Sequence, residues 1–255
     1  MPEARPDYVQ SLERGLAVLT SFSGETPALT LSDVARRTGL TRATARRLLL
    51  TLEELGYVGS DGRLFHLRPK TLDIGYAYLS SLPVAEIAVP YMEELSTALH
   101  ESSSAAILDG EDIVYIARVP AKRIMSVGLA VGSRLPAHAT SMGRVLLAAL
   151  GPAELDAFLD TATLTPITRR TVTDPCRLRQ ILDETRRRGW ALVDQELEDG
   201  VRSIAAPVRD GSARPVAALN CSAHAGRVTL ERLVAEFVPR LLDAAERVSA
   251  ALGAR

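Results

Sequence analysis

The residues that first suggest chemistry are His138, Ser141 and Gly143, within the run GSRLPAHATSMGRVLLAAL. The stretch ATSMG differs by one letter from the G-x-S-x-G pattern, which places a nucleophilic serine on a strained turn between a strand and a helix. The histidine lies three positions before the serine. One function that the sequence raises is therefore a serine hydrolase with Ser141 as its nucleophile.

The segment before Ser141 argues against catalysis. A nucleophile elbow needs a buried apolar strand that runs straight into the serine. Here the segment reads as a loop interrupted by Pro136, and Ala139 stands where the pattern requires glycine. Asp194 and His224 are candidates for a charge relay, but any long chain supplies such residues. We therefore predict that the protein is not an enzyme, and nothing in the sequence indicates a cofactor.

The same turn suits a binding site for an anion. Thr140 or Ser141 can cap the helix that follows, and Gly143 allows close packing. The first free N–H groups of a helix, together with its dipole, attract a carboxylate. Arg134 is placed to add a charge-assisted contact. A plain capped helix without a ligand explains these residues nearly as well, so the residues alone leave both interpretations open.

Composition limits the class of protein further. The chain has 255 residues, of which 47% are hydrophobic and 24% charged, as expected for one large or two ordinary well-cored domains. The net charge of −1 means that any nucleic-acid signal must be local. The chain has only two cysteines, Cys176 and Cys221, which favours a reducing cytoplasm. Cys221 and His224 have metal-like spacing but no further ligands nearby, so we expect no metal.

The hydropathy of the chain gives a further expectation about where the protein is located. The N-terminus has no apolar core segment typical of a signal peptide, and no run approaches about 18 apolar residues. We therefore expect no membrane-spanning helix and a cytoplasmic protein.

The DNA-binding signal lies in the first 68 residues. Three helical patterns are separated by short loops, and Thr41 can cap the third helix after the turn TGLT. This helix, 42–55, has an apolar stripe and a basic face, with its acids confined to the C-terminal end. A recognition helix has this layout, although a solvated amphipathic helix would share it. The hairpin signal Asp61-Gly62 adds a wing, so we predict a winged helix-turn-helix.

The expected DNA contacts divide by chemistry. Arginine suits bidentate contact with guanine, and a small residue lets the backbone approach the bases. Contacts to bases are expected from Thr41, Arg42, Ala43 and Arg46. Contacts to phosphates are expected from Arg47 and from Arg63 at the wing tip.

The rest of the chain predicts an α+β fold, an antiparallel sheet flanked by helices. Strands are expected over 104–109, 112–119, 123–132, 190–200, 201–208 and 215–223. Helices are expected over 84–100, 143–151, 152–160, 176–189 and 229–252. The predicted domains are a DNA-binding domain at 1–68, a linker helix at 69–83 and a second domain at 84–255.

Over nearly its whole length the chain resembles the IclR family of bacterial transcription regulators. The resemblance is carried by SLERGLAVLTSF, TLSDVARRTGLTRATARRLLLTLEELGYV, GYAYLSS, LPAHATSMGRVLLAAL and EDGVRSIAAPV. The stretch RIMSVGLAVGSRLPAHATSMGRVLLA is most similar to the branch that regulates aromatic-acid breakdown through the β-ketoadipate pathway. Gly143-Arg144-Val145 stands where many members have Gly-Lys-Ala, which points to this branch and away from a glyoxylate-type ligand.

The resemblance implies a winged helix joined to a GAF-like effector domain, assembled as a homodimer or a dimer of dimers. It also implies that effector contacts come from the helix turn and two later strands. Arg134 and Thr140 are added from their chemistry, and Asp194 is a weaker candidate. The expected effector residues are therefore Arg134, Thr140, Ser141, Met142, Asp194, Val201, Ser203, Asn220 and Ser222.

The function that we expect is a transcription regulator controlled by a small aromatic carboxylate. Examples of such an effector are 4-hydroxybenzoate and protocatechuate. The two winged helices of a dimer would read a palindromic DNA operator. A dimeric regulator that needs no ligand is the alternative within the same class of protein.

Overall fold

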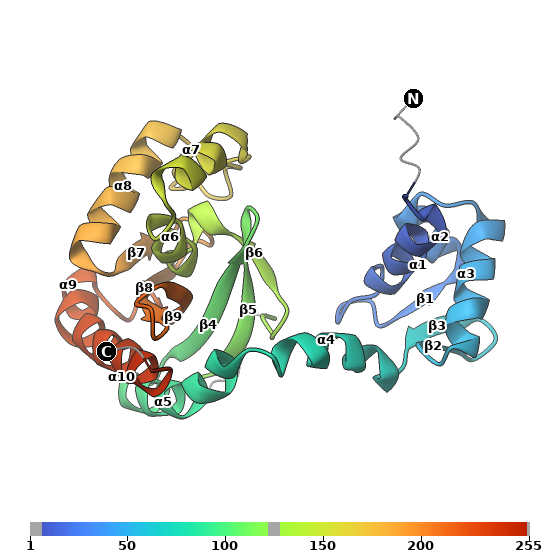
Figure 1. The fold of residues 1–255 in the computed structure, drawn as a ribbon, viewed down its shortest axis with the longest axis horizontal. Coiled ribbons are helices and arrows are strands. Elements are labelled where there is room, and N and C mark those ends of the chain that lie inside the picture. The colour runs from blue at the N-terminus through green and yellow to red at the C-terminus, as the bar shows by residue number, and fades with distance from the viewer. Residues whose placement is uncertain (1–6, 122–127, 254–255) are drawn as a thin grey trace. The chain divides into compact units, whose positions relative to one another are not determined.

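The chain folds into two compact units, Met1–Ser81 and Leu82–Arg255. The structure is a computed structural model that describes residues 7–121 and 128–253 (Figure 1). Each unit has a hydrophobic core of its own. The predicted linker segment 69–83 is for the most part helical and falls almost entirely within the first unit. No helix in the described ranges is long and apolar enough to cross a membrane.

The first unit is a winged helix-turn-helix, as predicted. Its three-stranded sheet is antiparallel, with the strand order β1-β3-β2. The elements are α1 (Gln10–Thr20), β1 (Ala28–Thr30), α2 (Leu31–Thr38), α3 (Arg42–Glu54), β2 (Val58–Ser60), β3 (Leu64–Leu67), the 3-10 turn η1 (Pro69–Thr71) and α4 (Leu72–Leu79). Strand β1 was not expected, because three residues are too few to show the alternation by which a strand is identified.

Short polar contacts define where the two helices of the DNA-binding motif begin and end. Thr30 and Asp33 form a capping box at the start of α2, and Gly39 ends this helix in the left-handed conformation, with φ of 66°. The Thr41 hydroxyl accepts a hydrogen bond from the Thr44 N–H at 3.2 Å and so begins α3. The loop between the helices is therefore short, which fixes where α3 can lie relative to α2.

The wing turn is held by one carboxylate. Asp61 accepts hydrogen bonds from the N–H groups of Leu64 at 2.7 Å and Arg63 at 2.9 Å. These bonds stabilise the charged form and hold the pKa of the Asp61 carboxyl below its usual range. Gly62 supplies the positive φ of 93° that the turn needs. The turn thus presents the Arg63 side chain at its exposed tip.

The second unit is built on one six-stranded antiparallel sheet, with the order β6-β5-β4-β9-β8-β7. Its strands are β4 (Ser102–Asp109), β5 (Asp112–Val119), β6 (Arg134–Pro136), β7 (Ala191–Asp194), β8 (Val201–Arg209) and β9 (Pro215–His224). Its helices are α5 (Pro83–Leu99), the 3-10 turn η2 (Ala137–Ala139), α6 (Ser141–Ala148), α7 (Pro152–Thr161), α8 (Pro175–Arg188), α9 (Leu230–Arg232), a π-helical turn (Leu233–Phe237) and α10 (Val238–Ala251).

Three expectations for this unit need correction. The third strand predicted over 123–132 lies partly outside the described residues, and its described part, 128–132, is not a strand. The position beside β5 is taken instead by β6, in the segment that was expected to be a loop. The prediction over 190–200 was also too long, because β7 ends at Asp194 and a loop follows.

Helices cover both faces of the sheet. Helices α5 and α10 pack on one face, and α6 lies on the other with α7 and α8 outside it (Figure 1). On the α5 face, the Ser103 hydroxyl donates a hydrogen bond to the Met92 carbonyl at 2.9 Å. The sheet is therefore the middle layer of an α+β domain, as predicted.

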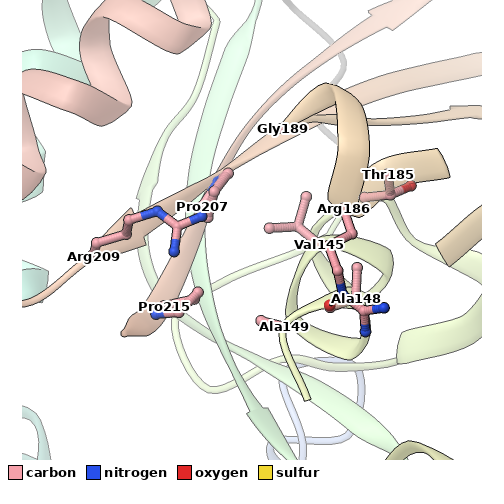
Figure 2. Close-up of a pocket in the computed structure, with 9 residues that line it drawn as sticks. All are labelled: Val145, Ala148, Ala149, Thr185, Arg186, Gly189, Pro207, Arg209 and Pro215. Carbon is pink, nitrogen blue, oxygen red and sulfur yellow. Dashed lines mark hydrogen bonds between the residues drawn. The ribbon is translucent and has the colours of Figure 1, made fainter. Parts of the chain in front are cut away.

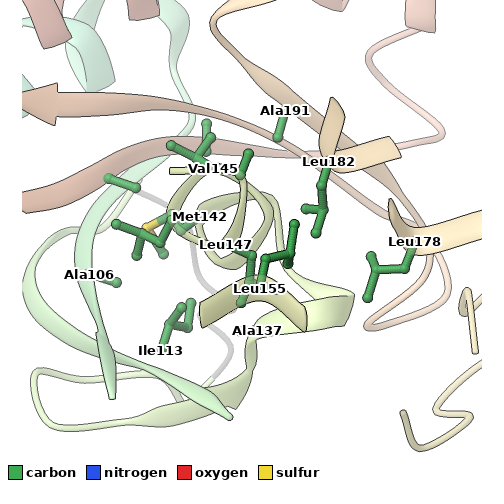
Figure 3. Close-up of a cluster of buried hydrophobic side chains, with 14 of the residues drawn as sticks. Ala106, Ile113, Ala137, Met142, Val145, Leu147, Leu155, Leu178, Leu182 and Ala191 are labelled. Atoms are coloured by element: carbon green, nitrogen blue, oxygen red, sulfur yellow. The ribbon is translucent and has the colours of Figure 1, made fainter. Parts of the chain in front are cut away.

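Small residues let α6 lie close to the sheet. The strands present alanines to this helix, and Met142 and Val145 pack above them (Figure 3). The alanines are Ala106, Ala191, Ala205 and Ala218, and all four are fully buried. Since their side chains are short, the helix axis can approach the strands. Because of this close packing, the first turn of α6 lies near the polar residues Asn220 and Ser222 of β9.

Candidate effector-binding site

A cavity of about 440 Å³ lies between one face of the sheet and the first turn of α6. Seven of the nine predicted effector residues line it, namely Thr140, Ser141, Met142, Val201, Ser203, Asn220 and Ser222. The sheet register explains why the strand residues meet, because Ser203 and Ser222 are direct cross-strand partners on β8 and β9. Asn220 is two residues from Ser222 and therefore shares its face.

The first turn of α6 carries an unpartnered hydroxyl. Thr140 is the cap, since its hydroxyl accepts a hydrogen bond from the Gly143 N–H at 3.1 Å. Ser141 begins the helix and is 1% exposed, and its Oγ has no hydrogen-bond partner in the described chain. The N–H groups of Ser141 and Met142 have no acceptor there either. Buried polar groups of this kind are almost always paired, so the turn is suited to a ligand.

Asn220 supplies a second unpartnered group from the sheet. Its Nδ2 donates a hydrogen bond to the Ser222 hydroxyl at 3.1 Å. Its Oδ1 is buried without a partner among the described residues. The cavity therefore holds polar atoms from two elements, α6 and β9, that still have hydrogen-bonding capacity to offer.

A β-bulge adds two polar side chains that the sequence did not point to, Tyr115 and Arg118. Tyr115 lies opposite Ala106 on β4, and Arg118 lies opposite Ser104. Between these two pairs, β5 advances by three residues while β4 advances by two, so β5 contains one extra residue. In a regular strand Tyr115 and Arg118 would face opposite sides, but past the bulge both line the cavity.

Two predicted effector residues do not line the cavity. Arg134 lies on the short edge strand β6, where its guanidinium pairs with Asp109 at 2.7 Å and with Asp112 at 3.2 Å. The Asp194 carboxylate is held between Arg202 and Arg170, at 2.5 and 2.9 Å. Both side chains have ionic partners of their own, and neither is carried into the function proposed below.

The loop 195–200 forms another wall of the cavity through Leu197 and Glu198. Gln195 begins it with a positive φ of 61°, which is uncommon for a residue other than glycine. Its side-chain oxygen accepts a hydrogen bond from the Gly200 N–H at 3.1 Å, and its N–H donates to the Val201 carbonyl at 2.8 Å. These bonds close the loop on itself and hold its lining residues in place.

Among the residues that the structure describes, the site lacks the groups that a serine nucleophile needs. Strand β6 is separated from Ser141 by the turn η2, so no strand runs into the serine. The ring of His138 is buried and its Nε2 lies 3.2 Å from the Thr165 carbonyl, not at the serine. Burial lowers the pKa of His138 below its usual value. Ser141 therefore has no base within reach in the described chain.

The Cys221 and His224 pair does not form a metal centre. No group of three or more metal-ligating side chains is arranged to hold an ion in the ranges that the structure describes. The two residues are three apart on β9 and so point to opposite faces of the sheet. Burial raises the pKa of the Cys221 thiol, which opposes the thiolate that a metal would need.

A second hollow, of about 220 Å³, lies at the other end of α6 (Figure 2). Val145, Ala148, Pro207 and Pro215 form its apolar walls. The Arg186 guanidinium at its edge donates to the Ala148 carbonyl at 2.8 Å and so serves the end of the helix. None of the predicted effector residues lines this hollow.

The recognition helix α3 leaves its basic face free in the first unit. All six predicted DNA-contact residues are exposed: Thr41, Arg42, Ala43, Arg46, Arg47 and Arg63. In the described chain none of the four arginines has an acidic partner within ion-pair distance. The buried side of the helix packs through Ala45, Leu49 and Leu52. An unpaired basic face of this kind is what a nucleic-acid surface requires.

A winged helix-turn-helix with a free basic face, joined to a second unit with a polar cavity, defines a DNA-binding regulator. Comparison with known proteins identifies the family. Residues 11–62 match the IclR helix-turn-helix domain, and residues 76–250 match the family described as bacterial transcriptional regulator IclR C-terminal. The chain belongs to the IclR family of transcription regulators, as the sequence predicted, and is not an enzyme.

Individual relatives agree with this assignment. The Pca regulon regulatory protein of Pseudomonas putida is 49% identical over 94% of this chain and 82% of its own length. The p-hydroxybenzoate hydroxylase transcriptional activator of Acinetobacter baylyi is 34% identical over 95% of this chain and 91% of its own. These relatives fit the aromatic-acid branch.

A solved structure shows the same architecture. An IclR homologue from Microbacterium hydrocarbonoxydans, crystallised with 4-hydroxybenzoate, superposes with a TM-score of 0.84 and is 27% identical. The match covers 95% of this chain and 99% of the other.

Proposed function

We propose that the cavity binds a small aromatic carboxylate, such as 4-hydroxybenzoate or protocatechuate, and that this ligand controls DNA binding. The observation that carries the proposal is the pair of buried, unpartnered polar groups, Ser141 Oγ and Asn220 Oδ1, in one cavity. Leaving such groups unpaired costs about 1–3 kcal/mol each, which a polar ligand would recover. The homologue crystallised with 4-hydroxybenzoate supports an aromatic acid as the ligand class.

The carboxylate would bind at the first turn of α6. There the free N–H groups of Ser141 and Met142 and the positive end of the helix dipole favour an anion. Val193, Val201 and Leu129 would contact the ring, because they form apolar parts of the cavity wall. Thr140 would act indirectly, since its hydroxyl is occupied as the helix cap.

Calorimetric titration of the full-length protein with 4-hydroxybenzoate, protocatechuate and cyclohexane tests this proposal. We expect saturable binding of the two acids and none of cyclohexane. Ser141→Ala should weaken both acids about tenfold, since it removes a hydrogen bond to a charged group. Absence of any binding of either acid at millimolar concentration would overturn the proposed ligand class.

The protein would act as a homodimer or a dimer of dimers. Helix α4 has no buried residue although most of it is apolar, with Leu72 72% and Tyr76 71% exposed. On α1, Leu12 and Leu16 are also exposed. Groups of exposed apolar side chains normally pack against a partner, and a second copy of the chain supplies a matching group. Analytical ultracentrifugation of the full-length protein and of its Tyr76→Ser variant would test this. We expect the variant to self-associate more weakly than wild type.

In such a dimer, two copies of α3 would read a palindromic operator in the cytoplasm. Thr41, Arg42, Ala43 and Arg46 would contact bases, and Arg47 and Arg63 would contact phosphates. The segment 69–83 would link the DNA-binding domain at 1–68 to the effector domain at 84–255. The ligand would change operator affinity by binding one arrangement of the dimer better than another.

A further inference from the structure

The β5 wall of the cavity carries two polar groups that the proposed carboxylate site does not use. Arg118 is half-buried, and its Nη1 donates one hydrogen bond, to the Ser104 hydroxyl at 3.3 Å. No carboxylate lies within ion-pair distance of it in the described chain. Tyr115 is 5% exposed, and its hydroxyl has no hydrogen-bond partner among the described residues. A guanidinium and a phenol therefore face the cavity with most of their hydrogen-bonding capacity unused.

Arg118 is separated from Asn220, which supplies the unpartnered amide oxygen on the β9 wall of the cavity. Arg118 lies opposite Ser104, and Ser104 lies opposite Asn220 on the next strand. The backbone of Arg118 is thus two strand spacings, or about 10 Å, from the backbone of Asn220. Both residues line the same cavity, so one ligand can contact both. The cavity has two polar walls, one formed by α6 and β9 and the other by β5.

We propose that Arg118 and Tyr115 bind a ring hydroxyl of the effector, on the side of the ring opposite its carboxylate. This inference rests on the proposed function and adds to it a requirement for a hydroxylated aromatic acid. Arg118 donates a hydrogen bond to the hydroxyl oxygen of the ligand, and the Tyr115 oxygen accepts a hydrogen bond from that hydroxyl. Plain benzoate leaves both groups unpaired, and a site built to pair with a hydroxyl rejects the analogue that lacks it.

The β-bulge is what makes this contact possible. Without the extra residue in β5, the side chain of Arg118 would point to the α5 face of the sheet, away from the cavity. The bulge therefore determines that the Arg118 guanidinium lies on the cavity face of the sheet. Bulges often redirect side chains beside binding sites in this way.

The test compares 4-hydroxybenzoate with benzoate by calorimetry on the full-length protein. Wild type should bind 4-hydroxybenzoate at least tenfold more tightly than benzoate. Arg118→Met should weaken 4-hydroxybenzoate about tenfold to a hundredfold and benzoate less than twofold. Tyr115→Phe should weaken only 4-hydroxybenzoate, by severalfold. Ser141→Ala is the matched control, because it should weaken both acids by the same factor.

The outcomes separate the two proposals. If wild type binds neither acid, the proposed function fails and this inference fails with it. If wild type binds both acids and Arg118→Met weakens them equally, Arg118 holds the carboxylate and only this inference is overturned. An unchanged affinity in both Arg118→Met and Tyr115→Phe also overturns it alone. Should Arg118→Met not fold, as judged by thermal unfolding, Tyr115→Phe decides the question with the same two ligands.

Discussion

Arg144 and Glu196 form a buried, bidentate ion pair that joins helix α6 to the loop after β7. The two guanidinium nitrogens lie 2.7 and 2.5 Å from the two carboxylate oxygens. The remaining nitrogen of Arg144 donates to the His138 carbonyl at 3.0 Å, and Glu196 accepts from the Val172 N–H at 3.0 Å. The arginine that departs from the common Gly-Lys-Ala pattern thus connects two walls of the cavity, the first turn of α6 and the loop 195–200.

Glu196→Gln tests the contribution of this pair to stability. The substitution leaves the Arg144 charge buried without a carboxylate, so the free energy of unfolding should fall by about 3–5 kcal/mol. The matched control is Asp156→Asn, which breaks the exposed pair between Asp156 and Arg179. That change should cost less than about 1 kcal/mol. Urea unfolding of both variants measures the difference, and equal losses would contradict a structural role for the buried pair.

Gly143→Ala tests the packing of the first turn of α6. A Cβ at Gly143 would overlap the backbone of Ala137, so something must move. We expect the variant to lose about 1–3 kcal/mol of stability despite the better helix propensity of alanine. Gly15→Ala in α1 is the control, because nothing lies within 4 Å of its added Cβ. The control should gain up to about 1 kcal/mol, and a similar gain at Gly143 would refute the overlap.

His138 predicts a pH dependence of stability. Burial lowers the pKa of His138 in the folded state, with further effects from the charges of Arg144, Glu196 and Glu111. Below the ordinary histidine pKa of about 6.5, the unfolded state therefore binds a proton more readily than the folded state. Stability is retained above that pH and lost as the pH falls below it. Thermal unfolding between pH 8 and 5.5 should show a steeper loss for wild type than for His138→Gln. Parallel curves would contradict the prediction.

The basic face of α3 predicts two kinds of DNA-binding defect. Operator affinity can be measured with a duplex obtained by selection from random DNA. Arg46→Ala should weaken the free energy of binding to this operator by about 1–3 kcal/mol and should lower the preference for the operator over other sequences. Arg47→Ala should instead weaken binding to all sequences and lower the salt slope by about one. Arg187→Ala on α8 is a control of equal charge, at an exposed residue of the other unit. Identical behaviour of all three variants would remove α3 from the DNA interface.

The first unit was predictable from sequence because its signals are local. A capping threonine, a glycine stop and an Asp-Gly turn each act within a few residues. The order of the later strands and helices followed from the same kind of pattern. The exception was 123–132, where an apolar, β-branched run suggested a strand, while the edge position in the structure belongs to β6.

The cavity was only partly predictable, because its wall depends on sheet register. Asn220 and Ser222 could be placed together by their spacing on one strand. Arg134 was predicted to make a charge-assisted contact with the carboxylate, but on β6 its guanidinium pairs with Asp109 and Asp112. Neither Tyr115 nor Arg118 was predicted to line the cavity, because strand alternation places residues three apart on opposite faces and a single extra residue in β5 brings these two to the same face. No sequence signal marks such a bulge in advance.

Effector control is tested most directly by operator affinity, measured at constant salt with and without saturating 4-hydroxybenzoate. The coupling between two sites is typically five- to 150-fold, and we predict a change of at least fivefold in wild type. Ser203→Phe fills the cavity from β8, so its operator affinity should not respond to the ligand. An unchanged affinity in wild type, or an equal response in Ser203→Phe, would contradict control through this cavity.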